Sequence, residues 1–259
     1  MDKIEKLNKA HLLNIDICNN ISKKKFKNLD SWILFQSSSF KTENINTKKL
    51  KFKSYKRGSI VFIDFGIGIG SELSGKHFAI VLSKNDNPKN SKLTVLPLSS
   101  KNNNGNNIPL NKELIDLTFQ DLIILKFKLS QFYTNIKIAI DTKQDNLKFE
   151  DKTQSNIFKN IHKIAKKHFN KVEDEDGSFY LTKEETFQII QLANEQIDYL
   201  IDFYNNFNKN SYAVIDNITT ISKFKTNKPI NEFDNLNSLQ ISDELLNIID
   251  EMIIKKLTK

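Results

Sequence analysis

The sequence predicts an α+β fold, in which a small antiparallel sheet is accompanied by two helical regions. Three short apolar runs are typical of strands, because they are rich in β-branched and aromatic residues and are separated by Gly, Asn, Asp and Pro. These runs cover residues 60–65, 78–82 and 93–98. Their spacing favours an antiparallel barrel or sandwich over alternating strand–helix units. Because Pro97 has no backbone N–H to donate, we expect its strand to lie at an edge or a bulge of the sheet.

Apolar residues at helical spacing identify the two helical regions, one within residues 2–30 and one within residues 114–210. In the second region a helix begins at Thr182, where Glu185 completes a reciprocal capping arrangement. An earlier helix places five residues on one face, namely Ile157, Ile161, Ile164, Ala165 and His168. We therefore expect a helical hairpin, joined by the acidic run 173–176. Its expected contacts with the barrel are Ile157, Ile161, Phe187, Ile190 and Ile197.

Length and composition bound the class of protein. A chain of 259 residues that is 39% hydrophobic can bury a core in one or two domains. Its single cysteine, Cys18, excludes an internal disulfide and fits a reducing compartment. No apolar run approaches the roughly 18 residues that cross a bilayer, and the N-terminus lacks the apolar stretch of a signal peptide. We therefore expect a cytoplasmic protein with no membrane partner.

The positive charge of the chain is concentrated at its N-terminus. The whole chain carries a net charge of +8, and residues 1–57 hold 14 Lys and Arg against 5 Asp and Glu, which leaves +8 − 9 = −1 for the rest. Aromatic residues are interleaved with these charges, among them Phe26, Trp32, Phe40 and Phe52. This mixture can hold phosphates and stack bases, so nucleic acid is the expected partner class. The alternative is a solvated helix whose aromatic residues pack on the main domain.

Neither a nucleotide-binding motif nor a metal motif is found. The glycines of residues 66–70 do not match the dinucleotide-binding spacing, so we interpret them as a flexible loop that lets Ser71 and Glu72 reach a substrate. His162 and His168 are six residues apart and lie on different helix faces, which is unsuitable for metal binding. We therefore expect no metal and no cofactor.

Two compact polar segments at predicted strand ends have the composition of an active site. The first contains Ser71, Glu72, Lys76 and His77, and the second is Pro97-Leu98-Ser99-Ser100. An imidazole, an ammonium and a hydroxyl group can manage the protons and negative charge of phosphodiester cleavage. The order of these segments resembles that of the MazF/PemK ribonuclease toxins. Residues 211–225, SYAVIDNITTISKFK, are also similar to a strand and turn of that family, and residues 241–257 stand where it has a closing helix.

The resemblance implies a fold and an activity. It implies a small SH3-like antiparallel barrel, formed by residues 56–113 and 211–259 with a C-terminal helix. A basic helical extension at residues 1–55 and a helical insertion at residues 114–210 would be additions to the family. The implied activity is that of a metal-independent endoribonuclease toxin, which cleaves single-stranded RNA through attack by its 2′-hydroxyl group. The implied partners are single-stranded RNA, a cognate antitoxin and a second copy in a homodimer.

The resemblance also assigns residues. His77 stands where the family has its catalytic arginine, Ser99 matches a Thr or Ser, and Asp216 matches an acidic residue, so these three are the expected catalytic residues. The expected RNA-binding residues are Arg57, Ser71, Glu72, Lys76, Ser100, Asn217 and Thr220. Arg57 is the only arginine in the chain, and we expect it and Lys76 at the rim of the groove. Histidine can exchange protons but carries less fixed charge than arginine.

Two other functions remain open at this point. The missing arginines and the basic N-terminus favour a nucleic-acid-binding module of the same fold that does not cleave. The helical insertion favours a regulator that docks on a partner. Individual residues also have structural alternatives: Ser71 and Glu72 can cap a turn, and Ser99 and Ser100 can satisfy backbone groups at a strand end.

Overall fold

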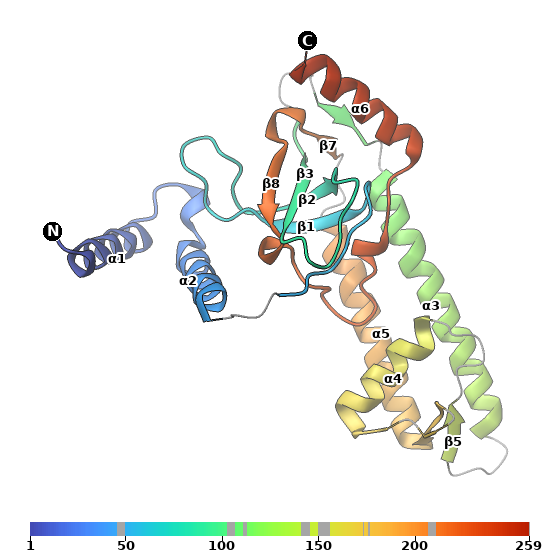
Figure 1. Cartoon of the computed structure of the whole chain (residues 1–259). Coiled ribbons are helices and arrows are strands. Elements are labelled where there is room, and N and C mark those ends of the chain that lie inside the picture. Colours follow the sequence, from blue (N-terminus) through green and yellow to red (C-terminus); the bar gives the residue numbers. More distant parts are fainter. Residues whose placement is uncertain are drawn as a thin grey trace. The chain divides into compact units, whose positions relative to one another are not determined.

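A computed structural model describes most of the chain (Figure 1). The described residues are 1–45, 50–102, 107–110, 113–140, 146–149, 156–172, 174–175, 177–206 and 211–258. They form two compact units, one made of residues 1–109, 212–227 and 240–259, and one made of residues 110–211 and 228–239. Helices and antiparallel strands are both present, which confirms the predicted α+β class. Within the described residues, no helix is long and apolar enough to cross a membrane.

The first unit contains an antiparallel sheet in which β3 is the central strand. Its strands are β1 (Ile60–Asp64), β2 (Lys76–Val81), β3 (Lys92–Ser99), β4 (Ile108–Pro109), β7 (Tyr212–Ala213) and β8 (Thr219–Ser222). The order is β1-β2-β3-β7-β4, and β8 also pairs with β3. The three predicted strands are thus confirmed. The described strands do not close into a barrel, so the SH3-like barrel is not confirmed; a single bridge, Ile63 to Thr226, joins β1 to the segment after β8.

The expectation that Pro97 lies at a sheet edge or bulge is wrong. Pro97 pairs with Ala79 of β2, on one side of the central strand. On its other side β3 changes partner, from β8 opposite Lys92–Val95 to β7 opposite Leu98–Ser99. The Pro97 carbonyl accepts a hydrogen bond from the N–H of Val214 on that side. The missing N–H therefore falls where the strand passes from one neighbour to the next, and no ladder bond is lost.

Alternating residues of the sheet form an apolar core. The cluster consists of Tyr55, Val61, Ile63, Ala79, Val81, Leu93, Val95 and Ile221. Val61 and Ile63, Ala79 and Val81, and Leu93 and Val95 are each two residues apart, which places them on one face of the sheet. The sequence identified these strands from short β-branched and aromatic runs bounded by turn residues, and the structure shows which residues of each run face the core.

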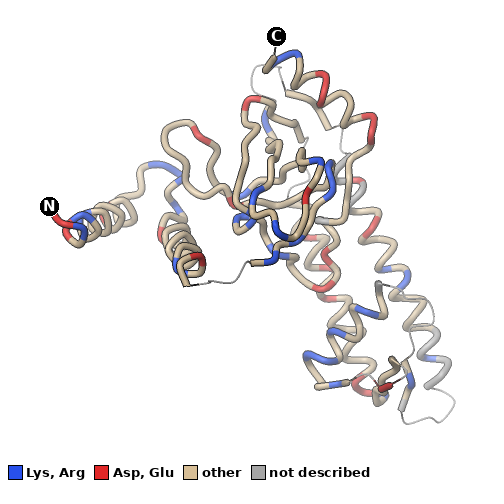
Figure 2. Tube along the Cα trace, viewed as in Figure 1, with Lys and Arg blue, Asp and Glu red and all other residues tan. Residues whose placement is uncertain are grey.

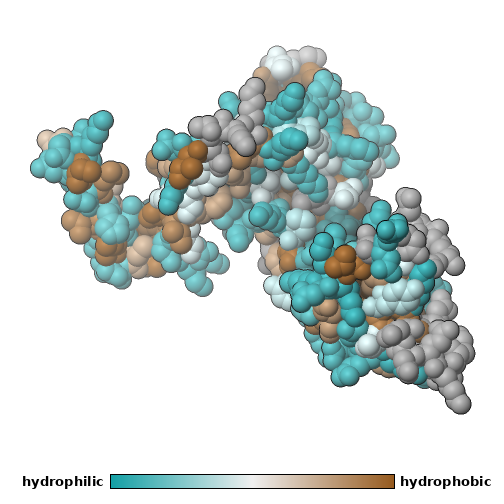
Figure 3. All heavy atoms as spheres, turned by 60° about the horizontal axis from the view of Figure 1, so that its bottom comes forward, coloured by the Kyte–Doolittle hydropathy of each residue, from teal (hydrophilic) through white to brown (hydrophobic). Residues whose placement is uncertain are grey.

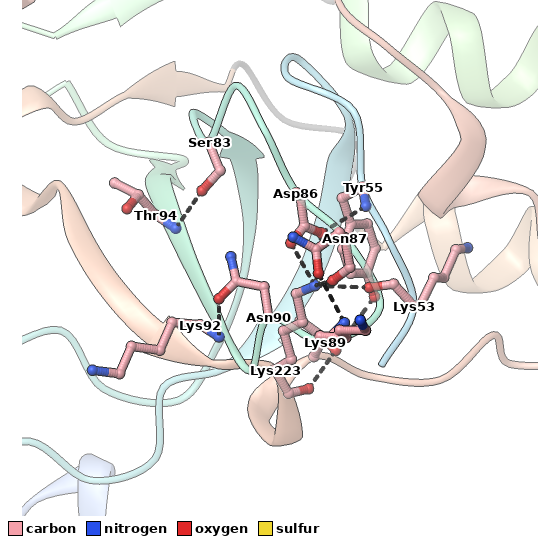
Figure 4. A network of polar contacts seen from close by, with 11 residues as sticks. Lys53, Tyr55, Ser83, Asp86, Asn87, Lys89, Asn90, Lys92, Thr94 and Lys223 are labelled. Carbon is pink, nitrogen blue, oxygen red and sulfur yellow. Dashed lines mark hydrogen bonds and ion pairs between the residues drawn. The ribbon is translucent and has the colours of Figure 1, made fainter. Parts of the chain in front are cut away.

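A buried ion pair fastens the loops beside this core (Figure 4). The Lys223 ammonium lies 2.7 Å from both carboxylate oxygens of Asp86, and the two side chains are 1% and 0% exposed. The ammonium also donates to the carbonyl of Lys53, and the Tyr55 N–H donates to Asp86. Burial of Tyr55 raises the pKa of its hydroxyl group. Each charge is thus compensated by several partners, as buried charges require.

Helices precede and follow the sheet in the first unit. At the N-terminus are α1 (Lys3–Asn19), η1 (Lys24–Phe26) and α2 (Leu29–Ile45). Helix α1 begins with a capping box between Asp2 and Glu5 and buries none of its residues, and its apolar side chains appear brown on the surface at the left of Figure 3. After β7 come η3 (Ile215–Asn217), β8, η4 (Lys223–Lys225) and α6 (Asp243–Leu257). Helix α6 is the expected closing helix.

The second unit is not the simple helical hairpin that we expected. It contains α3 (Glu113–Ile140), β5 (Asn146–Phe149), α4 (Asn156–Phe169), β6 (Phe179–Thr182), α5 (Lys183–Asn205) and η5 (Leu236–Ser238). The two predicted helices, α4 and α5, are confirmed, and so is the capping box of Thr182 and Glu185. However, β5 pairs with β6, and α3 is an additional long helix. Residues 173 and 176 of the expected acidic turn lie outside the described residues.

Four of the five apolar residues that we expected to pack on the barrel are buried, and one is not. The packing on the barrel itself stays a prediction. Ile157, Ile161, Ile190 and Ile197 are buried, whereas Phe187 is 42% exposed. Phe187 stacks edge-on against Tyr133 of α3, with 6.0 Å between ring centres. The helix that it touches was not recognised in the sequence, so its apolar period could not be assigned to a partner.

Candidate functional site

An open polar pocket of ≈ 420 Å³ lies in the first unit. Four segments of the chain line it: the loop between β1 and β2, the end of β3, the residue just before β4, and the turn η3 with the residue before it. The lining residues are Ser71, Glu72, Leu73, Ser74, Pro97, Leu98, Ser99, Asn107, Val214, Asp216 and Asn217. The volume falls in the usual range for small-ligand pockets, about 300–1,000 Å³. The fold therefore brings together five of the ten predicted site residues, which are Ser71, Glu72, Ser99, Asp216 and Asn217.

The β1–β2 loop is closed by its own hydrogen bonds. The N–H of Gly75 donates to the carbonyl of Gly66 at 2.7 Å, and the Phe65 N–H donates to the carbonyl of Gly75 at 2.9 Å. Gly66 has φ +79°, a left-handed conformation that favours glycine. At the tip, the Glu72 carboxylate accepts a hydrogen bond of 2.9 Å from the N–H of Ile69. Glu72 thus caps the turn and faces the pocket at the same time.

The end of β3 contributes Ser99 to the pocket. Ser99 pairs with Tyr212 of β7, and its hydroxyl oxygen accepts a hydrogen bond of 3.0 Å from the N–H of Lys101. The hydroxyl proton remains able to turn toward another acceptor, because a hydroxyl group has one donor and two lone pairs. Ser99 can therefore serve the strand end and still donate to a phosphate oxygen.

Asp216 belongs to an exposed ion pair that the sequence did not indicate. It lies on η3, and its carboxylate is 2.7 Å from the ammonium of Lys256 on α6. The Asp216 side chain is 62% exposed and that of Lys256 is 24% exposed. Lys256 escaped attention because basic residues in the last turn of a helix are common. Only the fold shows that the end of α6 lies against η3.

His77 lies behind the pocket wall and is half-buried. Its Nδ1 is 3.3 Å from the carbonyl oxygen of Leu98, and its Nε2 is 3.1 Å from that of Ser74, and both of these residues line the pocket. A neutral imidazole has one N–H, so it can donate to only one of the two carbonyls, whereas the imidazolium ion can donate to both. The ring therefore links the β1–β2 loop to β3.

The other predicted RNA-binding residues lie away from the lining. The Arg57 guanidinium donates to the carbonyl of Leu82 and pairs with Asp250 of α6, near the end of β2 that is opposite to His77. Lys76 is exposed at the start of β2, across from Asp64. Thr220 contacts Thr94, with 3.0 Å between the hydroxyl oxygens, and Ser100 is exposed after β3. These four residues do not join the pocket in this structure.

Charge is unevenly distributed around the pocket. The lining residues named above include two carboxylates and no Lys, Arg or His. The ammonium of Lys256 donates a hydrogen bond to one of these carboxylates, that of Asp216. Figure 2 shows Lys and Arg residues (blue) in the stretch between α1 and α2 and at other places on both units. Among the described residues, no group of three or more His, Cys, Asp or Glu side chains could hold a metal ion.

Comparison with known proteins gives a family for part of the chain. A family model, described as PemK-like, MazF-like toxin of type II toxin-antitoxin system, matches residues 56–169. No curated protein matches the chain. The matched range contains β1 to β4 and runs on through α3 and α4, which we expected to lie outside the resemblance; it stops before residues 211–259. The resemblance to the PemK-like, MazF-like toxin family is therefore confirmed for residues 56–169.

Proposed function

We propose that the protein is an endoribonuclease toxin that binds single-stranded RNA at the polar pocket and cleaves it there. The convergence of Ser99, Asp216 and Asn217 with the loop residues Ser71 and Glu72 is the observation that carries the proposal. These residues come from segments that are distant in the sequence, and their chemistries complement one another. A cognate antitoxin, a homodimer and a cytoplasmic location belong to the same proposal.

The proposed reaction is an attack by the RNA on its own backbone. The 2′-oxygen forms a bond to phosphorus, and the bond between phosphorus and the 5′-oxygen of the next nucleotide breaks. The products are a 2′,3′-cyclic phosphate and a 5′-hydroxyl group. The reaction needs a base for the 2′-hydroxyl, donors for the charged phosphorane and an acid for the leaving oxygen.

The pocket supplies a candidate for each of these tasks. The Asp216 carboxylate accepts the proton of the 2′-hydroxyl group. Lys256, at 2.7 Å from Asp216, places positive charge beside the phosphate and gives a proton to the leaving oxygen, after which the pair re-equilibrates its proton. Ser99 and Asn217 donate hydrogen bonds to the non-bridging oxygens. The resemblance implies that none of these steps requires a metal ion.

His77 has a different place in this proposal from the one its sequence position suggested. Its two ring nitrogens face the carbonyls of Ser74 and Leu98, so the ring must release one of them before it exchanges a proton with RNA. We assign it the task of holding the β1–β2 loop against β3. The general acid–base role expected from the family position remains the alternative, and substitution of His77 separates the two.

Incubation of the purified full-length protein with a mixed-sequence single-stranded RNA in EDTA tests the proposed function. Fragments that end in a 2′,3′-cyclic phosphate are expected. RNA that is retained by the protein but stays intact would instead identify a nucleic-acid-binding module. Two observations together favour this second function: the basic stretch between α1 and α2 (Figure 2) can bind phosphates, and the named lining residues include no cation to stabilise a phosphorane. A protein that neither cleaves nor retains the RNA would instead be identified as a regulator that docks on a partner.

A further inference from the structure

The segment between α1 and α2 contacts the β1–β2 loop, and the proposed chemistry does not use this contact. We call residues 66–75 the pocket loop. The ammonium of Lys25 donates hydrogen bonds to two of its carbonyls, that of Gly68 at 3.0 Å and that of Gly70 at 2.9 Å. Figure 1 shows the loop as a teal excursion beside the blue N-terminal segment. A single charged group thus binds two backbone carbonyls of a glycine-rich loop whose tip, residues 69–72, is exposed.

A second contact holds the beginning of the same loop. The indole of Trp32, on α2, lies directly on Gly66, since a Cβ atom added at Gly66 would meet the ring at 2.2 Å. The Lys225 ammonium lies over the Trp32 ring, 5.2 Å from its centre, and donates to the carbonyl of Phe65 at 3.5 Å. Trp32 of the basic segment is therefore packed against Gly66 and makes a cation–π contact with Lys225.

We infer that Lys25 and Trp32 are positioning residues for the pocket, through which the N-terminal segment sets the conformation of the pocket loop. The loop carries Ser71 and Glu72 at the pocket mouth, and its glycines give it many alternative conformations. Two charge-assisted hydrogen bonds and one aromatic contact select a single arrangement from these. The consequence for RNA cleavage rests on the proposed function, whereas the consequence for the loop does not.

Hydrogen exchange of the pocket loop tests this inference in the full-length protein. Four amides of the loop donate hydrogen bonds within it, those of Gly68, Ile69, Glu72 and Gly75, and the last three serve as the reporters. Lys25→Ala removes both hydrogen bonds from Lys25 to the loop and is expected to speed the exchange of the reporters about tenfold or more, because a hydrogen bond to a charged group contributes more than a neutral one. Lys25→Arg should restore the slow exchange, because a guanidinium also donates to two carbonyls. Lys27→Ala, at an exposed lysine two residues away, should leave exchange unchanged.

Two further measurements keep the test independent of RNA cleavage and of folding. Trp32→Ala should speed exchange of the same three amides. Gly66→Ala should increase their exchange by a smaller factor in the Trp32→Ala background than in the native protein, because the indole that an added Cβ atom would meet is then absent. If the protein cleaves RNA, Lys25→Ala should lower kcat/KM severalfold and Lys25→Arg should restore it. Unchanged exchange in both Lys25→Ala and Trp32→Ala would overturn the inference. Faster exchange in a protein that never cleaves RNA would overturn only the proposed function.

Discussion

Two lysine–aspartate pairs in the first unit have the same separation and opposite environments. Lys223 and Asp86 lie 2.7 Å apart and are 1% and 0% exposed, and Lys256 and Asp216 lie 2.7 Å apart and are 24% and 62% exposed. The buried pair is surrounded by backbone carbonyls and an N–H that compensate its charges. The open pair has solvent on the pocket side. The same chemical pair is therefore enclosed in the interior in one place and open to solvent in the other.

This difference has an energetic reason. Removing one partner of a buried pair leaves a charge without solvent, which costs about 3–5 kcal/mol. An exposed pair contributes only about 0–1 kcal/mol, because water screens both charges. Evolutionary or experimental change is thus far less costly in stability at Lys256 than at Lys223. A proton-transfer pair needs this freedom, since its charges must change during the reaction.

The largest expected effect is the loss of the buried ammonium. Lys223→Met should lower the free energy of unfolding by about 3–5 kcal/mol, because Asp86 would remain buried without its counter-charge. Urea denaturation of the variant and the native protein measures this change. Lys256→Met is the matched control, with the same substitution in a pair of the same length, and should change stability by less than about 1 kcal/mol. Similar losses in both variants would remove the distinction between the pairs.

The next effect concerns the open pair and is read in cleavage. Asp216→Asn keeps the size of the side chain but removes its ability to accept a proton, so cleavage should fall by about 10²-fold or more, the usual scale for a lost general base. Stability should change by less than about 1 kcal/mol. Single-turnover cleavage in EDTA, with RNA binding measured in parallel, checks both statements. Full activity in Asp216→Asn would exclude this pair from the chemistry.

His77 sharpens the comparison, because its ring contacts two backbone carbonyls, whereas the family resemblance predicted a catalytic role for it. His77→Ala should lower cleavage by about 10-fold to 10²-fold while RNA binding persists, through either a lost proton carrier or a displaced loop. His77→Gln distinguishes the two, since an amide can donate to one carbonyl but cannot exchange a proton at neutral pH. Activity that is mostly retained in His77→Gln supports the positioning role. Activity raised by His77→Arg would show that histidine weakens a function for which arginine is better suited.

The sequence predicted local structure well and contacts between distant segments poorly. The strands around Val61, Ala79 and Val95 were recognised because a short β-branched and aromatic run bounded by turn residues is a local signal. The caps of α5 and α6 lie within four residues of the positions they serve, and Thr182 was identified on that basis. Lys256 was missed because only its contact with Asp216 places it at the pocket, and Asp216 is 40 residues away in the chain. The clustering of Ser99 with Asp216 was predicted only through the family resemblance.

The remaining errors have the same origin. Pro97 was expected at an edge, since local chemistry alone shows only that its N–H is absent, and the change of partner from β8 to β7 is a property of the whole sheet. Arg57 was expected at the pocket because it is the only arginine, but Asp250 and the Leu82 carbonyl hold it at the other end of β2. A charged residue can be recognised in a sequence, whereas its partner is chosen by the fold.

A third pair, in the second unit, has intermediate exposure and the smallest expected effect. Lys171 and Glu185 lie 2.9 Å apart and are 27% and 21% exposed, and Glu185 also belongs to the capping box of α5. Desolvation raises the pKa of the Glu185 carboxyl, but hydrogen bonds from Lys171 and Thr182 outweigh it, and the net pKa is lowered. A carboxylate with a lowered pKa stabilises the folded state above its unfolded pKa, and this contribution disappears as the pH falls through the folded pKa. We therefore expect Glu185→Gln to cost about 1 kcal/mol or less at neutral pH, with the difference from the native protein vanishing in acid. Urea denaturation at a series of pH values measures it, and a difference that persists unchanged into acid would show that the carboxylate charge has no part in the stability of α5.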